Sequence, residues 1–314
     1  MKAYAIDEFG QPGTIRELPD PQPEEGQVRV RVSAAGLNPF DGAVVNGYAK
    51  DYMEHRFPLV PGIDAAGTID AVGAGVEGWD TGDRVFGSVG KPFAGEGTLA
   101  QYVTMSTGTI ARTPDALGDR EVAAIPVAGA TAFQLAEDLG LGGGDIVVAV
   151  GATGGVGTYF VQLAARVEAL VVAVCSTENA EYARSLGAAE VVDYSAEDVA
   201  ETVRALHPEG IDAIANMHGD PDTLARLSEL VRQGGRVASI TGGVDVDALA
   251  ARGISGANVM GRATTENLGE LAALLDSKDL VVPPITEYPL EAAGEAFAAV
   301  ASGHTRGKIV VTIH

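Results

Sequence analysis

The stretch from residue 143 to residue 163 constrains the fold more than any other part of this 314-residue chain. A run of apolar, mostly β-branched residues over 146–150 leads into a glycine cluster, and a helical pattern begins at Gly155. A strand, a tight turn and a helix N-terminus in this order bring exposed amides and the positive end of the helix dipole to one point, which suits a pyrophosphate. The spacing Ala152-x-Gly154-x-x-Gly157 departs from the dinucleotide-binding pattern only at its first residue. A tight turn that binds nothing is the alternative interpretation.

More strand–helix units follow this turn, which favours a parallel sheet covered by helices on both faces. The apolar runs predict strands at 146–150, 170–174, 190–192, 211–215 and 236–240. The segments between them predict helices at 155–167, 180–186, 196–206 and 221–232. We therefore predict an α/β fold with a doubly wound parallel sheet, in a dinucleotide-binding domain over residues 121–265.

Residues 1–120 show a different pattern, in which short β segments alternate with glycine turns. Residues 27–32 alternate polar and apolar side chains, as in a strand with one buried face, and a loop is expected over 33–41. Many short strands of this kind predict a partly closed β-barrel. The tail over 303–311 is predicted as a turn and a final strand, and because this strand has no partner in the strand–helix series, we expect it to return to the barrel. Residues 266–314 are therefore grouped with residues 1–120 as a substrate-binding and catalytic domain.

The formal net charge of −22 limits the partners of the chain. Such an acidic surface repels nucleic acids and anionic membranes, so the expected partner is a small molecule. The single cysteine, Cys175, rules out an internal disulfide and a zinc site built from several cysteines. The first residues mix charged and apolar side chains, and no apolar run of about 18 residues is present, so we expect a cytoplasmic protein.

Six segments carry a family resemblance through their order and spacing. They are AGLNPFD at 35–41, PGIDAAG at 61–67, GDRVF at 82–86, GTLAQYV at 97–103, GATGGVG at 151–157 and RGKIV at 306–310. Together they resemble the medium-chain dehydrogenases/reductases, and most of all the zinc-independent quinone oxidoreductase (zeta-crystallin-like) branch. The resemblance implies a GroES-like barrel domain, a Rossmann domain and a nicotinamide cofactor in the cleft between them. It also implies a homodimer, with residues 256–260 as the candidate edge strand between subunits.

The differences from zinc-dependent alcohol dehydrogenases predict the mechanism. In those enzymes a cysteine ligand stands at the position of Asn38 and a histidine ligand at that of Ile63. Because zinc prefers thiolate and imidazole ligands, an amide and an isoleucine leave no catalytic metal site. We therefore expect hydride addition to an acceptor that its own conjugation already polarises, such as a quinone or an α,β-unsaturated carbonyl.

Three side chains are candidates for catalysis. Asn38 can donate a hydrogen bond to a substrate carbonyl oxygen, or it can be a turn residue before Pro39 that caps backbone groups. Tyr48 and Tyr52 follow in the loop where the substrate pocket of the family forms, and a phenol there can orient the substrate or supply a proton. Their alternative is that of partly buried aromatic residues with the hydroxyl in water.

The expected cofactor is NADPH, with NADH as the alternative. The glycine turn supplies the expected phosphate contacts, which are Gly151, Ala152, Thr153, Gly154, Gly155, Val156 and Gly157. Ser176 and Thr177 end the second strand of the series, where an NAD site usually has an acidic residue, so they favour NADP. Further contacts to the nicotinamide half or the phosphates are expected from Thr131, Ser239, Thr241, Arg306 and Lys308.

The leading hypothesis is an NADPH-dependent oxidoreductase that transfers hydride to a quinone or an α,β-unsaturated carbonyl. The second is an enoyl-thioester reductase or a tailoring reductase of a biosynthetic pathway. The third, from another class, is a non-catalytic NADPH-binding regulatory protein.

Overall fold

The computed structural model describes residues 1–314, which form two compact units. The first unit contains Met1–Ala130 and Ala263–His314, and the second contains Thr131–Arg262. The structure therefore places the boundaries near Ala130 and Ala263, where the sequence predicted 120 and 266. The first boundary lies later because α2 (Asp119–Ala123) packs on strands of the first unit.

The second unit is built on a six-stranded sheet with the order β12-β11-β10-β13-β14-β15. Its strands are β10 (Ile146–Val150), β11 (Leu170–Cys175), β12 (Glu190–Asp193), β13 (Ile211–Asn216), β14 (Val231–Ser239) and β15 (Ser255–Asn258). All neighbouring strands are parallel. The order reverses between β10 and β13, as in a doubly wound dinucleotide-binding sheet. The predicted parallel sheet is confirmed.

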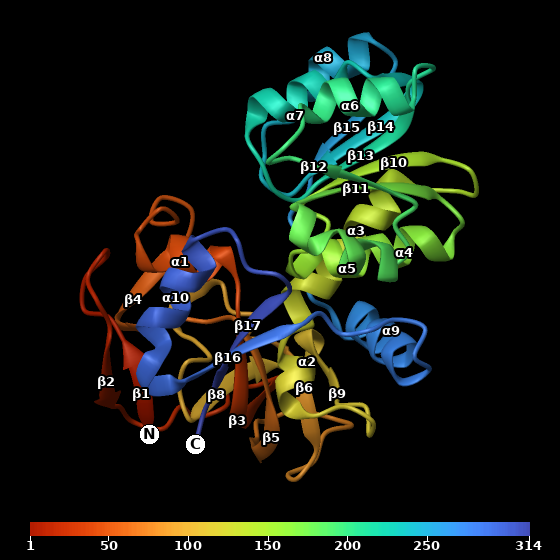
Figure 1. The fold of residues 1–314 in the computed structure, drawn as a ribbon. Helices are drawn as coiled ribbons and strands as arrows, with labels where there is room; N and C mark the ends of the chain where they lie inside the picture. Colours follow the sequence, from red (N-terminus) through yellow and green to blue (C-terminus); the bar gives the residue numbers. More distant parts are fainter. The chain divides into compact units, whose positions relative to one another are not determined.

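Helices cover both faces of this sheet. Figure 1 shows α6 (Val199–Leu206), α7 (Pro221–Ser228) and α8 (Val246–Ala251) over one face, and α4 (Gly155–Arg166) and α5 (Ala180–Ser185) over the other. Because both faces are covered, the central strands bury successive residues and not alternate ones. The valines and alanines of β10 from Val147 to Ala149 are fully buried. The remaining helix of this region, α3 (Pro126–Leu139), runs from the first unit into the second.

The first unit is built on a seven-stranded sheet with the order β16-β17-β3-β5-β6-β9, in which β8 also pairs with β3. Its strands are β3 (Gln27–Leu37), β5 (Asp64–Val72), β6 (Arg84–Ser88), β8 (Tyr102–Ser106), β9 (Ile110–Arg112), β16 (Ile285–Pro289) and β17 (Lys308–Thr312). Two small sheets pair β1 (Lys2–Ala5) with β2 (Thr14–Glu17), and β4 (Glu54–Val60) with β7 (Phe93–Glu96). Its longer helices are α9 (Thr265–Asp276) and α10 (Ala293–Ala301).

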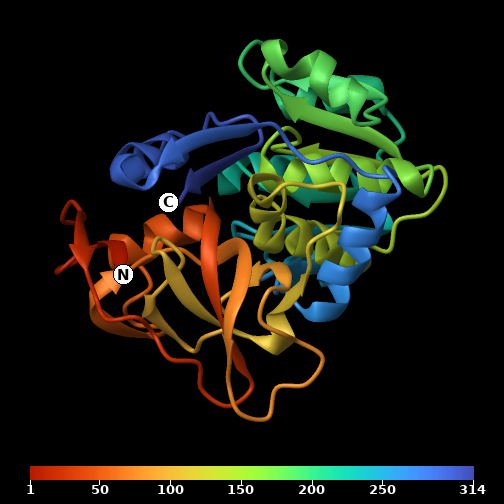
Figure 2. The ribbon, with the colours of Figure 1, turned by 90° about the horizontal axis from the view of Figure 1, so that it is seen from below.

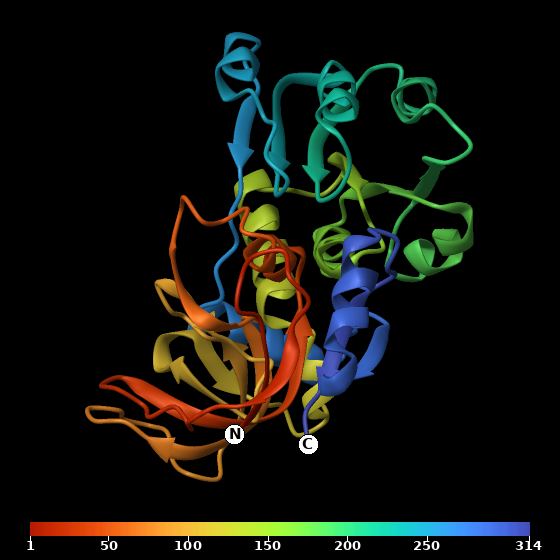
Figure 3. The ribbon, with the colours of Figure 1, turned by 90° about the vertical axis from the view of Figure 1, so that its left-hand side faces the viewer.

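The C-terminal strand returns to the N-terminal sheet, as predicted. β17 pairs antiparallel with β3, with Ile309 opposite Leu37 and Val311 opposite Ala35. Figure 2 shows the blue C-terminal strands beside the red and orange N-terminal ones. Gln101 joins the two chain ends, because its side chain accepts from the Lys2 amide at 2.8 Å and donates to the His314 carbonyl at 3.0 Å. Figure 3 also shows the two termini close together.

The prediction of a loop over 33–41 is wrong. β3 continues to Leu37, and α1 (Pro39–Val45) begins two residues later. The strand is prolonged because Ala35 and Gly36 pair with β5 on one side and β17 on the other. Small residues that read as a turn in sequence are here those that fit a crowded position between two strands.

Two helices are shorter than expected. α6 begins at Val199, because the Asp198 carboxylate accepts a hydrogen bond from the Glu201 amide and caps the helix there. α7 ends at Ser228, because the chain enters β14 at Val231. No helix combines the length and the apolar character needed to cross a bilayer.

Candidate functional site

The turn between β10 and α4 has a backbone that only glycine fits at two positions. Gly151 has a φ of +79°, and a Cβ there would be 2.7 Å from the Cβ of His218. A Cβ on Gly157 would be 2.2 Å from the Gly151 carbonyl oxygen. Gly157 therefore lets the first turn of α4 pack against the end of β10. The turn is compact and keeps its backbone close to anything bound above it.

The N-terminus of α4 differs from those of the three helices on the other face of the sheet, α6, α7 and α8. The first residues of α6, α7 and α8 are capped by Asp198, Asp220 and Asp245, whose carboxylates each accept from an amide of the first turn. α4 follows Gly154, which has no side chain to do this. Because the first amides of a helix have no partner within the helix, those of α4 remain available to an anion.

The end of β13 lies beside this turn. The Met217 amide donates to the Val150 carbonyl oxygen at 3.0 Å. Asn216 ends β13, and its Nδ2 donates to the hydroxyls of Ser239 and Thr241, both at 2.9 Å. The predicted residues Ser239 and Thr241 thus lie together at the carboxyl edge of the sheet, next to the reversal of strand order. Ligands of doubly wound folds bind at this edge.

Ser176 and Thr177 are held by neighbouring polar residues. Asp193, at the end of β12, accepts from the Thr177 amide at 3.1 Å and from the Thr177 hydroxyl. These hydrogen bonds, with those from Ser195, lower the pKa of Asp193 to about 2. Ser176 Oγ accepts from Asn179 Nδ2 at 3.0 Å. The Asp193 carboxylate, which these hydrogen bonds keep ionised near neutral pH, therefore anchors the loop that was predicted to select the cofactor.

Thr131 lies on α3 and is 5% exposed. Gly261 packs directly against Thr131, because a Cβ added to Gly261 would be 2.3 Å from the Thr131 hydroxyl oxygen. The backbone at Gly261 therefore passes directly over this hydroxyl. Thr131 therefore lies in a crowded position of the second unit, and its contact with a cofactor stays a prediction.

Asn38 is part of a buried polar cluster in the first unit, which we call the Asn38 cluster: Asn38, Asp41, Asp64, Ser88 and Lys308. Asn38 Nδ2 donates to Asp64 Oδ2 at 2.9 Å, and Asn38 Oδ1 accepts from Lys308 Nζ at 2.7 Å. Ser88 Oγ donates to Asp64 Oδ1 at 2.7 Å. The backbone N–H of Asn38 donates to Asp41 Oδ2 at 2.8 Å, and Asn38 is also the N-cap residue of α1.

Burial and charge compete within the Asn38 cluster. Burial raises the pKa of Asp64, while the charge of Lys308 and the hydrogen bonds from Asn38, Ser88 and the Val127 amide oppose that rise. Burial likewise lowers the pKa of Lys308, against the attraction of the two carboxylates. Burial raises the pKa of Asp41 to about 7. Three donors converge on Asp64, and this favours its ionised form.

The structure places Lys308, for which the sequence predicts a contact with the cofactor phosphates, in the Asn38 cluster. Its ammonium is buried and donates to the Leu37 carbonyl oxygen and to Asn38 within the first unit. The sequence placed Lys308 at the start of a strand, where a charged side chain is usually exposed. The strand is instead flanked on both sides, by β16 and β3, so its first side chain is enclosed.

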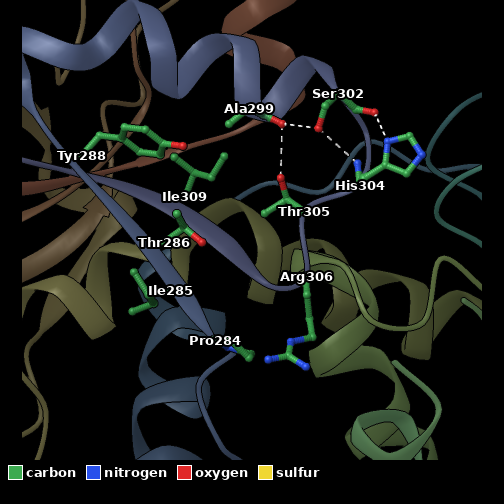
Figure 4. Close-up of a pocket in the computed structure, with 10 residues that line it drawn as sticks. All are labelled: Pro284, Ile285, Thr286, Tyr288, Ala299, Ser302, His304, Thr305, Arg306 and Ile309. Carbon is green, nitrogen blue, oxygen red and sulfur yellow. Dashed lines mark hydrogen bonds between the residues drawn. The ribbon is translucent and has the colours of Figure 1, made fainter. Parts of the chain in front are cut away.

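Arg306 lines a pocket of about 470 Å³ in the first unit. Figure 4 shows the pocket between β16, β17 and the end of α10, with Arg306 at one end and Tyr288 at the other. The loop that carries Arg306 is tied to α10, because the Thr305 hydroxyl donates to the Ala299 carbonyl oxygen at 3.2 Å. Arg306 is thus presented on an ordered loop.

Tyr48 and Tyr52 are not gathered into the Asn38 cluster. They follow α1 and are 77% and 89% exposed, respectively. Their phenols therefore face solvent in the first unit taken alone.

Two acidic residues of these sites escaped sequence reasoning. Asp64 stands between apolar residues in Pro61–Gly67, and Asp193 is the last residue of β12, after two valines. A carboxylate inside an apolar run has to be buried with partners, which is the signal that could have identified both.

Comparisons with known proteins agree with this architecture. The family model described as "Alcohol dehydrogenase GroES-like domain" matches residues 24–115, and that described as "Zinc-binding dehydrogenase" matches residues 186–311. The chain is similar to the chloroplast envelope quinone oxidoreductase homolog of Arabidopsis thaliana, with 30% identity over 94% of this chain and 92% of that protein. It is 29% identical to the chloroplastic NADPH-dependent alkenal/one oxidoreductase of the same plant, over 99% of this chain and 79% of that protein. The structure of the quinone oxidoreductase from Coxiella burnetii matches with a TM-score of 0.90 and 27% identity, over 100% of this chain and 99% of the other.

Proposed function

Because the chain belongs to the medium-chain dehydrogenases/reductases, among the quinone oxidoreductases, we propose that it transfers hydride from NADPH to a quinone or an α,β-unsaturated carbonyl. The observation that carries the proposal is the uncapped N-terminus of α4 behind a glycine turn, at the point where the strand order of the sheet reverses. This arrangement suits a pyrophosphate.

The second unit offers the groups that would hold the cofactor. The turn from Gly151 to Gly157 would bind the phosphates through backbone amides, and Ser239, Thr241 and Thr131 would contact the nicotinamide half. When bound, the nicotinamide supplies the hydride. Arg306 is the remaining predicted phosphate contact, from the loop that precedes β17.

The family also contains metal-dependent members, but the residues here do not fit zinc. Asn38 and Ile63 offer an amide and an alkyl group where thiolate and imidazole are needed. The oxygen of the amide already accepts from the Lys308 ammonium at 2.7 Å, and this positive charge opposes a second cation at the same oxygen. We therefore propose a zinc-independent reaction and derive no step through a metal.

Asn38 is the proposed hydrogen-bond donor to the acceptor oxygen. A quinone or an enone gains negative charge on oxygen as hydride arrives, and a fixed N–H stabilises that charge. The oxygen then takes a proton, for which we propose Tyr48 or Tyr52, since both phenols are exposed to water. The enzyme contributes orientation and hydrogen bonds, and conjugation in the acceptor supplies the electrophile.

The test is NADPH oxidation, followed by absorbance, with a panel of quinones, enones and enoyl thioesters. We expect turnover with quinones or enones, and a lower kcat in the Tyr48→Phe or Tyr52→Phe variant. Turnover with enoyl thioesters alone would support the reductase of a biosynthetic pathway. Tight NADPH binding without any turnover would support the non-catalytic regulatory protein and refute the proposal.

The preference for NADPH over NADH is a finer proposal. It is supported by the absence of an acidic side chain at Ser176 and Thr177 and by the name of the alkenal/one relative. The ionised Asp193 beside Thr177 opposes it, because a carboxylate repels a 2′-phosphate. The preference is measured by comparing kcat/KM for NADPH with kcat/KM for NADH. The Asp193→Asn variant should shift this ratio toward NADPH.

We also propose a homodimer and a cytoplasmic location. β15 is an edge strand of the second unit, and its free edge offers backbone groups to a second copy. Sedimentation equilibrium should give a dimer, and Ala257→Pro, within β15, should shift it toward the monomer.

The two plant relatives carry chloroplast names, so the proposed cytoplasmic location is tested directly by cell fractionation.

A further inference from the structure

The Asn38 cluster contains a lysine for which the proposed function so far gives no role. Lys308 is 5% exposed, and its ammonium donates to the Leu37 carbonyl oxygen and to Asn38 Oδ1, both at 2.7 Å. The carboxylates of Asp41 and Asp64 attract its charge. A buried ammonium is costly unless it is paired and hydrogen-bonded, so this site depends on all of these partners.

These contacts fix which way the Asn38 amide faces. Its oxygen accepts from a cation, and its nitrogen donates to a carboxylate of Asp64 at 2.9 Å. The reversed amide would set an N–H against the ammonium and an oxygen against the carboxylate. Only one of the two N–H groups of Nδ2 is used by Asp64, so the other can donate to a ligand.

The carboxylate at the other end of the amide is fixed as well. Asp64 Oδ2 also accepts from the Val127 amide at 3.1 Å, in the first turn of α3, and Oδ1 accepts from Ser88. The amide is therefore held from two sides. Lys308 connects it to β17, and Asp64 connects it to the start of α3.

We propose that Lys308 is a positioning residue for the reaction: it holds the amide of Asn38 so that an N–H, and not the carbonyl oxygen, faces the oxygen of the hydride acceptor. The inference rests on the proposed function, in which Asn38 donates to that oxygen. Lys308 itself need not touch cofactor or substrate.

The test compares Lys308→Met, which removes both charge and donor, with Lys308→Gln, which keeps a donor for Asn38 Oδ1. We expect Lys308→Met to lower kcat for a benzoquinone by about tenfold to a hundredfold, the scale of a misoriented catalytic group, with the Kd for NADPH unchanged. Lys308→Gln should recover most of that loss. In an Asn38→Ala background, Lys308→Met should cause little further loss in kcat, because the lysine acts through the amide.

Lys91 provides a matched control. It is also a largely buried lysine of the first unit, whose Nζ donates to Glu96 Oε2 at 2.7 Å, but it has no contact with Asn38. Lys91→Met should lower the melting temperature and leave kcat unchanged. Equal kcat in Lys308→Met and wild type would overturn the assignment while the proposed function stands. A wild-type protein without turnover overturns both.

A structure of the wild-type protein with NADPH and a quinone tests the inference without any variant, in case Lys308→Met does not fold. We expect Asn38 Nδ2 within hydrogen-bonding distance of a quinone oxygen and Lys308 still bonded to Asn38 Oδ1. A quinone oxygen bonded elsewhere, with no contact to Nδ2, would refute the role of Lys308.

Discussion

Gly157 is the residue at which the glycine turn is most sensitive to substitution. A Cβ there would be 2.2 Å from the Gly151 carbonyl oxygen and 2.6 Å from the carbonyl carbon of Ala152, so the turn has to move. We expect Gly157→Ala to lower the free energy of unfolding by about 1–3 kcal/mol. NADPH affinity should fall about tenfold or more, since the amides of the turn are displaced. Denaturant unfolding and NADPH fluorescence titration measure the two effects.

Gly269 is the control for this substitution. It lies in α9, and a Cβ added there meets no atom within 4 Å. Gly269→Ala should raise the free energy of unfolding by up to about 1 kcal/mol, as expected for an exposed helical glycine, and leave NADPH binding unchanged. A Gly157→Ala protein with wild-type stability and affinity would show that the turn does not approach its ligand closely.

Asp41 gives a pH dependence whose direction follows from its burial. Because burial raises its pKa to about 7, from 3.8 in the unfolded chain, the folded protein binds more protons than the unfolded one between these values. The contribution of Asp41 to stability is therefore present at low pH and is lost as the pH rises from about 4 to about 7, by a few kcal/mol at most. Asp41→Asn should remove this loss. Urea unfolding of both proteins across this pH range measures the difference.

At the scale of elements, a substitution at the N-terminus of α4 should change stability and NADPH affinity in opposite directions. Gly154 has extended backbone angles, and a Cβ there would contact only the Gly151 carbonyl oxygen, at 3.5 Å, so Asp fits as an N-cap. We expect Gly154→Asp to stabilise the cofactor-free protein by about 0.5 kcal/mol. Its carboxylate would accept from the amides that we propose hold the cofactor phosphates, so NADPH affinity should fall at least about tenfold. Thermal melts with and without NADPH should show both changes.

The N-cap of α8 provides a control, because its removal should lower stability without changing NADPH affinity. Asp245→Ala removes a carboxylate that accepts from the Ala248 amide at 2.9 Å, and should cost about 1 kcal/mol. Its affinity for NADPH should stay at the wild-type value. Unchanged NADPH binding in Gly154→Asp would mean that these amides do not hold the cofactor.

The elements of the second unit could be predicted because their signal is local. β10 was predicted with its observed bounds and the other strands within two residues, since each is a short apolar run between turns, except that β14 begins five residues earlier than predicted. The structure of segment 33–41 could not be predicted, because the end of β3 in this segment pairs with β17, which lies far away in the sequence. The same distance hid the partners of Asn38: Asp64 and Lys308 reach it from two other strands. A motif identifies such a residue, but only the sheet order identifies its neighbours.

At the scale of the whole molecule, the charge of −22 predicts a response to salt. Like charges repel within the folded state, and added salt screens them as the Debye length falls from about 30 Å at 0.01 M to about 8 Å at 0.15 M. We expect the melting temperature at neutral pH to rise over this range. Near pH 4.4, the sequence isoelectric point, the rise should vanish. A melting temperature that falls with salt at neutral pH would show that ion pairs such as Arg29–Asp70 outweigh the repulsion.

The return of β17 to β3 has a consequence for biosynthesis. The ribosome completes the second unit, a single continuous segment, while the first still lacks its final strand. Lys308 is delivered by that strand, so the Asn38 amide oxygen lacks its ammonium partner until β17 has been translated, whereas Asp64 is in place much earlier. With the proposed role of Lys308, a product that stops before β17 would retain all residues of the second unit and lack the oriented amide that turnover requires.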